Sequence, residues 1–319
     1  METGKAEDKK ILHVMTEHTG PFKILIEVLK ELLPEAILEF HKNYDADNNS
    51  SDSDSNSNSD SESKDTDKKK DNKKGGLRIM AIDSTRTVLI YLKLDSINFT
   101  EYKCSKDKLS LGVNMGYFHK LIKSMEKDDN LKLYVDKDDI NHLGIVIDNP
   151  EKQTTTKFKM NLMDLDEDDL EIPPAVFDAR IVIPSTEFHK IMREMHGYAE
   201  YVEIKCANNR IIFKCKGDYA ERETELRESE NSIAVQYKKN DNSLLIVQGI
   251  YELKHLVLFG KCTTLCNDIE IYMKNDYPLV IKYTVATLGR LLLCLTPVRG
   301  QDQNDYSSDE SENSDSDSD

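Results

Sequence analysis

The sequence of 319 residues predicts an α+β protein made of two similar halves, each containing antiparallel β-sheets and two short helices. Short segments alternate apolar and polar residues, and four other segments have apolar residues at helical spacing. The order helix, strands, helix, strands occurs before residue 157 and again after residue 178, which indicates a tandem duplication. Alternation over so few residues is typical of antiparallel sheets with one solvated face.

The predicted strands are short, and in each one about every second residue is apolar. The pair Asn208-Asn209 separates two of them, and asparagine tolerates the backbone conformation that a tight hairpin turn requires. The clearest strands are residues 131–135, 142–148, 202–206, 211–216, 269–274 and 279–285.

Four helices interrupt the strands. Asn114 and Ser185 are of residue types that favour the N-terminal cap position, so each is expected to begin a helix. Gly260 is expected to end one, because glycine is a common helix stop. The helices are predicted at residues 21–33, 114–125, 185–196 and 251–260.

Two segments are too polar to form a core. Residues 45–74 have nine acidic and six basic side chains, and residues 301–319 have eight acidic and no basic ones. Such chains bury too little apolar surface to offset conformational entropy, so both are expected to be disordered. The expected organisation is an N-terminal domain at residues 1–157 with the insert at 45–74, an acid-rich linker at 158–177, a C-terminal domain at 178–300 and a tail at 301–319.

The charge balance excludes a protein that binds nucleic acid through its overall charge. The formal net charge is −16, and without the two polar segments the remaining body is still acidic, near −5. Any DNA-binding surface must therefore be a segregated basic region.

The cysteines and the apolar runs indicate the cellular setting. Six cysteines occur singly in apolar segments, which predicts reduced thiols in an intracellular protein and no metal site. The N-terminus lacks the apolar stretch of a signal peptide, and no run of about 18 apolar residues indicates a membrane helix. We therefore expect a soluble, non-secreted protein without a membrane partner.

Each predicted helix carries two basic residues at a spacing that places them on about the same face. An ordinary solvated face explains any single pair, and acidic neighbours such as Glu27, Glu187 and Glu194 dilute the pattern. Four such helices in an acidic protein favour a surface that contacts phosphates without reading bases. The pairs are Lys23 and Lys30, Lys120 and Lys123, Lys190 and Arg193, and Lys254 and Lys261.

Five separated blocks resemble eukaryotic and archaeal sliding clamps of the proliferating-cell-nuclear-antigen type, in order and in spacing. The blocks are AIDSTRTVLI (81–90), LGVN (111–114), LMDLDEDDLEIP (162–173), IPSTEFHKIMRE (183–194) and DYPLVIKYTVATLGRLLLCLTP (276–297). The resemblance covers residues 11–43 and 75–299 and leaves out the insert and the tail. Such an insert is unusual for a cellular clamp, which points to a large DNA virus as the source.

The resemblance implies two tandem clamp-type domains and a closed homotrimeric ring joined head to tail. Such a ring encircles double-stranded DNA without sequence preference and acts as a processivity factor for DNA polymerase. It docks replication and repair enzymes and is placed on DNA by an ATP-dependent clamp loader. The four basic helices would line the hole, and Phe158 would lie on the edge strand that meets the next subunit. The resemblance implies no catalytic residue, metal or cofactor, and a location in the nucleus or in a viral replication compartment of the host cytoplasm.

The resemblance also implies a groove for client peptides beneath the linker. Two of its positions depart from the family pattern, because Cys294 replaces an aromatic residue and Arg86 occupies a basic or histidine position. Asn208 stands where eukaryotic clamps carry a lysine that is modified with ubiquitin, so that switch is expected to be absent or moved. The groove residues are Ile82, Arg86, Thr87, Leu170, Ile172, Pro278, Cys294, Thr296 and Pro297.

Two other functions stay open at this point. A magnesium-dependent nuclease would use the linker carboxylates of Asp164, Asp166, Asp168 and Asp169. No His, Lys or Tyr is fixed beside them as an acid or base, however, and no P-loop, GxSxG or HExxH motif occurs. A clamp-fold scaffold that serves only transcription or repair is the second alternative.

Overall fold

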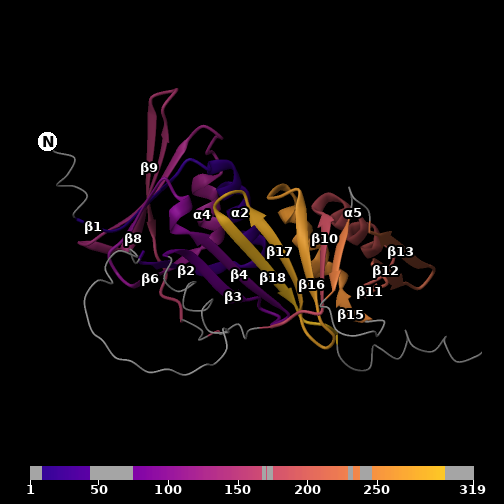
Figure 1. Cartoon of the computed structure of the whole chain (residues 1–319). Coiled ribbons are helices and arrows are strands. Elements are labelled where there is room, and N and C mark those ends of the chain that lie inside the picture. Colours follow the sequence, from indigo (N-terminus) through magenta and orange to yellow (C-terminus); the bar gives the residue numbers. More distant parts are fainter. Residues whose placement is uncertain are drawn as a thin grey trace, which may run out of the picture. The chain divides into compact units, whose positions relative to one another are not determined.

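The computed structural model describes residues 9–43, 75–166, 170, 175–228, 233–237 and 246–298 (Figure 1). The chain divides into two compact units, which we describe separately. The first comprises residues 1–81, 91–170 and 284–291, and the second comprises residues 82–90, 171–283 and 292–319. The insert at 45–74 and the tail at 301–319 lie outside the described residues, so the disorder expected of them stays a prediction.

Antiparallel strands form the framework of the first unit. It holds all or most of β1 (Lys10–Thr16), β2 (Glu35–His41), β3 (Gly76–Ile82), β4 (Val88–Asp95), β5 (Glu101–Cys104), β6 (Lys108–Asn114), β7 (Asn130–Asp136), β8 (Asp139–Asn149) and β9 (Thr154–Asn161). One sheet has the order β5-β1-β7-β8-β9, and β4-β3-β2-β6 are consecutive neighbours in another. The predicted strands 131–135 and 142–148 are confirmed within β7 and β8.

Two helices of the first unit, α2 (Thr19–Leu32) and α4 (Met115–Ile122), pack against each other (Figure 1). The rings of Phe22 and Phe118 meet edge to face with their centroids 6.4 Å apart. The Asn114 side chain accepts a hydrogen bond from the backbone N–H of Tyr117, which confirms the predicted cap of α4.

The second unit repeats this plan. It holds all or most of β10 (Ala179–Pro184), β11 (Tyr201–Ala207), β12 (Arg210–Lys216), β13 (Glu221–Arg227), β14 (Ala234–Tyr237), β15 (Val247–Glu252), β16 (Asp268–Met273), β17 (Leu279–Val285) and β18 (Gly289–Leu295). One sheet has the order β13-β12-β11-β15, and β14-β10-β16-β17-β18 are consecutive neighbours in another. Asn208 and Asn209 have φ of 51° and 57°, which confirms the tight hairpin between β11 and β12.

The helices of the second unit are α5 (Ser185–His196) and α6 (Leu253–Phe259), and α6 continues into the 3-10 turn η3 (Gly260–Thr264). The predicted cap role of Ser185 is wrong, because the cap residue is Pro184 and no side chain caps the helix. The Ser185 hydroxyl instead hydrogen-bonds the carbonyl oxygens of Thr263 and Cys266, at 3.2 and 2.7 Å. It therefore ties the start of α5 to the segment that follows α6.

Two element boundaries differ from the sequence prediction because strand pairing extends further. Tyr251 and Glu252 pair with Val202 and Tyr201 in β15, so α6 begins two residues later than predicted. β9 remains paired with β8 as far as Asn161, so the first residues of the predicted linker belong to a strand.

The six cysteines form no disulfide. Four of them are buried, and Cys266 and Cys294 are half-buried. The described helices are all too short or too polar to span a lipid bilayer.

Candidate nucleic-acid interface and peptide groove

Basic side chains gather on α2 and α4. Lys120 and Lys123 are exposed, and Lys30 is half-buried with its Nζ 3.2 Å from Glu31 Oε1. Both helices bury an apolar face against the unit, for example at Leu29 of α2, so their charged residues lie on the remaining surface.

His119 of α4 indicates how close these cations are to one another. Burial lowers the pKa of His119, and the charges of Lys30, Lys23 and Lys123 lower it further. Glu27 acts in the opposite direction. Because lysines from both helices act on one imidazole, the basic residues of α2 and α4 form a single positive region.

Lys23 has a structural contact that the sequence pattern did not reveal. Its Nζ donates a hydrogen bond to the carbonyl oxygen of Met125 at 3.0 Å, just beyond the C-terminal end of α4. A lysine at this place satisfies a carbonyl group near the helix end and ties α2 to the turn. A substitution of Lys23 would therefore disturb packing as well as charge.

The helices of the second unit carry the same kind of residues. Lys190, Arg193 and Lys254 are exposed on α5 and α6, and Lys261 is exposed on η3. Lys254 forms an ion pair with Glu252, with Nζ 2.5 Å from Oε2. An exposed pair of this kind leaves the lysine accessible to other anions.

Glu194 reduces the positive character of α5 less than its sequence position suggests. Its Oε2 accepts a hydrogen bond from Arg222 at 2.8 Å. This hydrogen bond lowers the pKa of Glu194, and the charges of Lys190 and Arg193 lower it further. The carboxylate is thus paired within the second unit, and the positive charge of α5 persists.

Tyr117, which the predicted basic pairs did not include, is 61% exposed on α4. Lys120 Nζ lies 5.3 Å from the centre of the Tyr117 ring, one helical turn away. The signal in the sequence was an aromatic residue three positions before a lysine of the predicted basic face. Tyr117 therefore belongs to the same accessible helix surface.

The groove positions of the second unit surround one turn. Asp83 Oδ1 accepts hydrogen bonds from the backbone N–H groups of Thr87 and Val88, at 2.9 and 2.7 Å. Burial alone would raise the pKa of Asp83, but hydrogen bonds from Thr85, Val88 and Thr87 lower it. Arg86 has φ of 58°, so the turn is tight and its side chain is exposed.

The C-terminal segment of the second unit lies beside this turn. Thr296 N donates to the carbonyl oxygen of Thr87 at 3.0 Å, and Val298 N donates to that of Ile250 at 2.9 Å. These two hydrogen bonds hold Pro297 between them. Thr87 and Thr296, which are far apart in the sequence, are thus in direct contact.

The remaining groove positions differ in exposure and in the unit to which they belong. Ile82 is 38% exposed at the end of β3, so it is not a core residue. Pro278 and Cys294 are half-buried, and burial raises the pKa of the Cys294 thiol to about 11, which keeps it neutral. Leu170 is half-buried and belongs to the first unit, and Ile172 lies outside the described residues.

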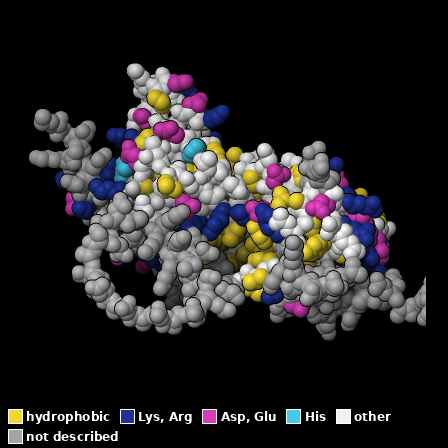
Figure 2. Space-filling model, viewed as in Figure 1, with side chains coloured by type: hydrophobic (Ala, Val, Ile, Leu, Met, Phe, Trp, Pro, Cys, Tyr) yellow, Lys and Arg dark blue, Asp and Glu magenta, His cyan; other side chains and the backbone are white. Residues whose placement is uncertain are grey.

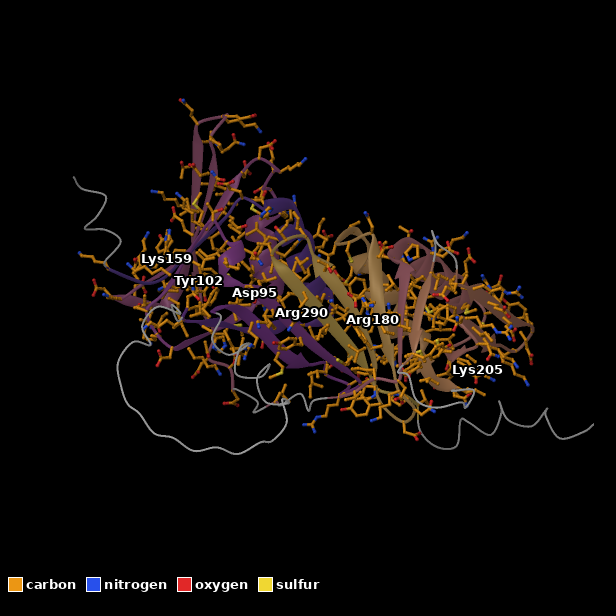
Figure 3. The ribbon with its side chains drawn as sticks, in the orientation of Figure 1. Asp95, Tyr102, Lys159, Arg180, Lys205 and Arg290 are labelled. Atoms are coloured by element: carbon orange, nitrogen blue, oxygen red, sulfur yellow. The ribbon has the colours of Figure 1, made fainter. Side chains whose placement is uncertain are left out.

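Phe158 lies half-buried on β9, opposite Ile145 of β8. β9 is the last strand in its sheet, and Lys157 and Lys159, the residues before and after Phe158, are exposed. Figure 3 labels Lys159. An edge strand with one apolar and two basic side chains is open to pairing with another chain.

The second unit has an open edge of opposite charge. β13 is the last strand of its sheet, and Glu221 and Glu223 are exposed on it. Glu225 of the same strand pairs with Arg210 and Arg227. The exposed acids of β13 therefore lie at the start of the strand, where Glu221 Oε1 is 3.4 Å from Lys216 Nζ.

Within the described ranges, no group of three or more His, Cys, Asp and Glu side chains is arranged to hold a metal ion. Asp164 and Asp166 of the candidate nuclease set are exposed. Asp168 and Asp169 lie outside the described residues.

Two tandem units of antiparallel sheets, each with a pair of basic helices, define the class of clamp-type proteins. Residues 64–170 match the family model of the proliferating cell nuclear antigen, N-terminal domain, and residues 171–298 match that of its C-terminal domain. The chain therefore belongs to the proliferating cell nuclear antigen family.

Relatives in viruses and in a fungus are similar over most of the chain. A "Probable DNA polymerase sliding clamp" of Acanthamoeba polyphaga mimivirus is 31% identical over 91% of this chain, which spans 63% of that relative's length. The "Probable DNA polymerase sliding clamp 1" of Paramecium bursaria Chlorella virus 1 is 29% identical, over 92% of this chain and 98% of its own. The "Proliferating cell nuclear antigen" of Chaetomium thermophilum is 28% identical, over 73% of this chain and 89% of that relative's length. The two viral relatives agree with the viral source suggested by the insert.

Proposed function

We propose that the chain is a subunit of a DNA sliding clamp, a non-catalytic ring that retains DNA polymerase on its template. The positive region on α2 and α4, repeated on α5 and α6, carries this proposal, because the protein as a whole has a net charge of −16. A segregated basic surface attracts phosphates locally, while the acidic remainder repels them. The names of the viral and fungal relatives support the same function.

The proposed contact with DNA is sequence-independent. The exposed cations are lysines and one arginine on helix surfaces, and these side chains neutralise phosphates through charge. Binding to free linear duplex is therefore weak and salt-sensitive, and retention comes from the closed ring. An ATP-dependent loader would open and close that ring around DNA.

Head-to-tail assembly would use the two open edges. The basic edge at Lys157 and Lys159 of β9 is complementary to the acidic edge at Glu221 and Glu223 of β13 in another copy. An interface made by two different surfaces of the same chain closes into a ring when the rotation between subunits is right. Three subunits of two units each complete the proposed homotrimer.

Replication in the nucleus or in a viral replication compartment is the proposed setting. Primer extension on long primed DNA, with loader and polymerase, tests the proposed role in replication. The expected result is longer products when the protein is present. A nuclease would shorten the template in magnesium without polymerase, and a scaffold restricted to transcription would leave product length unchanged. Either result would remove the replication clamp from consideration.

Client peptides are proposed to dock around the Asp83–Val88 turn and the segment that ends at Val298. The double substitution Leu170→Ala with Ile172→Ala is expected to lower the affinity for a labelled peptide at least tenfold. Apolar anchors dominate such binding, and each contributes roughly 1–3 kcal/mol. The probe carries a glutamine, an aliphatic residue and two aromatic residues. Fluorescence anisotropy measures the affinity.

A matched control for this variant is Ile97→Ala, which removes an apolar side chain that is 80% exposed in the first unit. It is expected to leave peptide affinity unchanged. Equal affinities for the wild type and the double variant would place the groove elsewhere.

A further inference from the structure

A hollow lies among β2, β3 and β4 of the first unit, and none of its lining residues belongs to the basic helices. It is lined by His41, Gly75, Gly76, Arg78 and Lys93, together with two leucines. Three of these side chains are cationic or become so on protonation, and none is acidic. The hollow therefore has the composition of an anion site.

The two glycines let the backbone segments around the hollow approach one another closely. Gly76 has φ of 144°, and a Cβ atom there would lie 2.1 Å from the carbonyl oxygen of Leu94. A Cβ atom on Gly75 would lie 2.6 Å from the backbone nitrogen of Asn43. A side chain at either position would force the backbone apart, so the close approach of these segments requires glycine.

The cationic groups are held within the sheet. Arg78 Nε is buried and has no hydrogen-bond partner among the described residues. Lys93 is only 6% exposed, and its Nζ lies 3.8 Å from Asp95 Oδ1. A buried guanidinium N–H without an acceptor is costly, so an anionic oxygen that enters the hollow gains a strong hydrogen bond.

Glu39, an acidic residue on β2 that contacts His41, already has two basic partners. Glu39 Oε1 lies 2.7 Å from Lys108 Nζ, and its Oε2 lies 3.2 Å from His41 Nε2. The hydrogen bond from His41 and the contact with Lys108 together lower the pKa of Glu39 to about 2, against the effect of burial. Glu39 therefore stays charged, with its own partners on β2 and β6.

Two further features surround the hollow. The Tyr102 hydroxyl donates hydrogen bonds to the carbonyl oxygens of His41 and Gly76, at 2.7 and 2.9 Å, and so fixes the two strands that form its wall. A Cβ atom on Gly289 would lie 2.1 Å from the carbonyl oxygen of Lys93, so the residue before Arg290 lies against β4. Figure 3 labels Tyr102, Asp95 and Arg290 in this region, and Figure 2 shows dark-blue basic side chains there.

We propose that this hollow binds a phosphate monoester, such as the side chain of a phosphoserine. Arg78 supplies a donor that lacks a partner among the described residues, and Lys93 supplies a second positive charge at the same opening. A phosphate carries more negative charge and more acceptor oxygens than a carboxylate, so it outweighs the opposing charge of Asp95.

The chain contains its own candidate source of the phosphate. The Ser/Asp-rich segment begins after Asn43 and ends before Gly75, and Gly75 lines the hollow. Serines among acidic residues suit an acid-directed kinase, and attachment to the same chain raises their effective concentration at the site. A phosphoserine of a partner protein has the same chemistry.

The test uses the unphosphorylated full chain and labelled peptides with the sequence of residues 50–62. The peptide with a phosphoserine is expected to bind at least tenfold more tightly than the unmodified peptide, and millimolar inorganic phosphate should displace it. Arg78→Gln is expected to lower phosphopeptide affinity at least tenfold. Lys205→Gln, the same type of charge loss on β11 of the second unit, should have no effect (Figure 3).

Arg78→Lys is a second variant that separates loss of binding from loss of fold, because it keeps the positive charge but lacks the guanidinium fork. It should bind the phosphopeptide with an intermediate affinity at an unchanged melting temperature. Kinase treatment of the full chain distinguishes the two sources of the phosphoserine. If the chain's own phosphorylated serines fill the hollow, binding of the added phosphopeptide should be lost. If the phosphoserine comes from a partner protein, that binding should be unchanged. Equal binding of both peptides, or full affinity in a folded Arg78→Gln protein, would overturn the proposal.

Discussion

Reversing Lys120, Lys123, Lys190 and Arg193 to Glu is expected to reduce the stimulation of DNA polymerase at least tenfold, with trimer assembly intact. All four side chains are exposed on α4 and α5, and each substitution replaces an attraction for phosphate with a repulsion. Lys23 is left unchanged because its hydrogen bond to Met125 supports the packing of α2 on α4. Product lengths in primer extension, measured over a range of salt concentrations, report the effect.

The matched control reverses four other exposed lysines, so that the net charge changes equally. Lys9, Lys103, Lys106 and Lys137 are suitable, since they lie off the four helices and off the two proposed subunit edges. This control protein should stimulate the polymerase nearly as well as the wild type. If both quadruple variants behaved alike, total charge would matter and the helix surfaces would not be the DNA-facing ones.

The second large effect is expected from Phe158→Asp, which should convert the trimer into monomers of 36.6 kDa. Phe158 is half-buried on the open edge of β9, and a carboxylate there would be desolvated without a partner when the next subunit covers it. Light scattering at micromolar concentration measures the mass of the assembly.

Phe158→Leu is the control, because it keeps an apolar side chain at the edge and should remain trimeric. The melting temperature of each variant separates loss of assembly from loss of fold. A folded Phe158→Asp protein that is still a trimer would exclude β9 as the subunit contact.

Local patterns were sufficient to predict the four helices and the clearest strands. The cap at Asn114 and the hairpin at Asn208-Asn209 depend on neighbouring residues only, and both are confirmed. The cap role of Ser185 failed because its hydroxyl bonds carbonyl groups 78 and 81 positions away. No periodicity in the sequence reports such a contact.

The same distinction applies to the candidate site. Helical spacing identified the basic faces, since that pattern is local. The contact between Lys23 and Met125 and the convergence of lysines on His119 arise only when α2 packs on α4. Thr87 and Thr296 meet across 209 positions, and only the resemblance to a known family suggested that both belong to one proposed groove.

The measurement that tests the ring most directly compares retention on circular and linear DNA. The loaded protein should stay on a nicked circular duplex through a high-salt wash and should be released when one cut linearises that circle. Such release follows from topology, because the surface contacts with phosphate are weak at high salt. Equal retention on the circle and on the cut DNA would contradict the account, since a protein held by direct binding does not need a closed path.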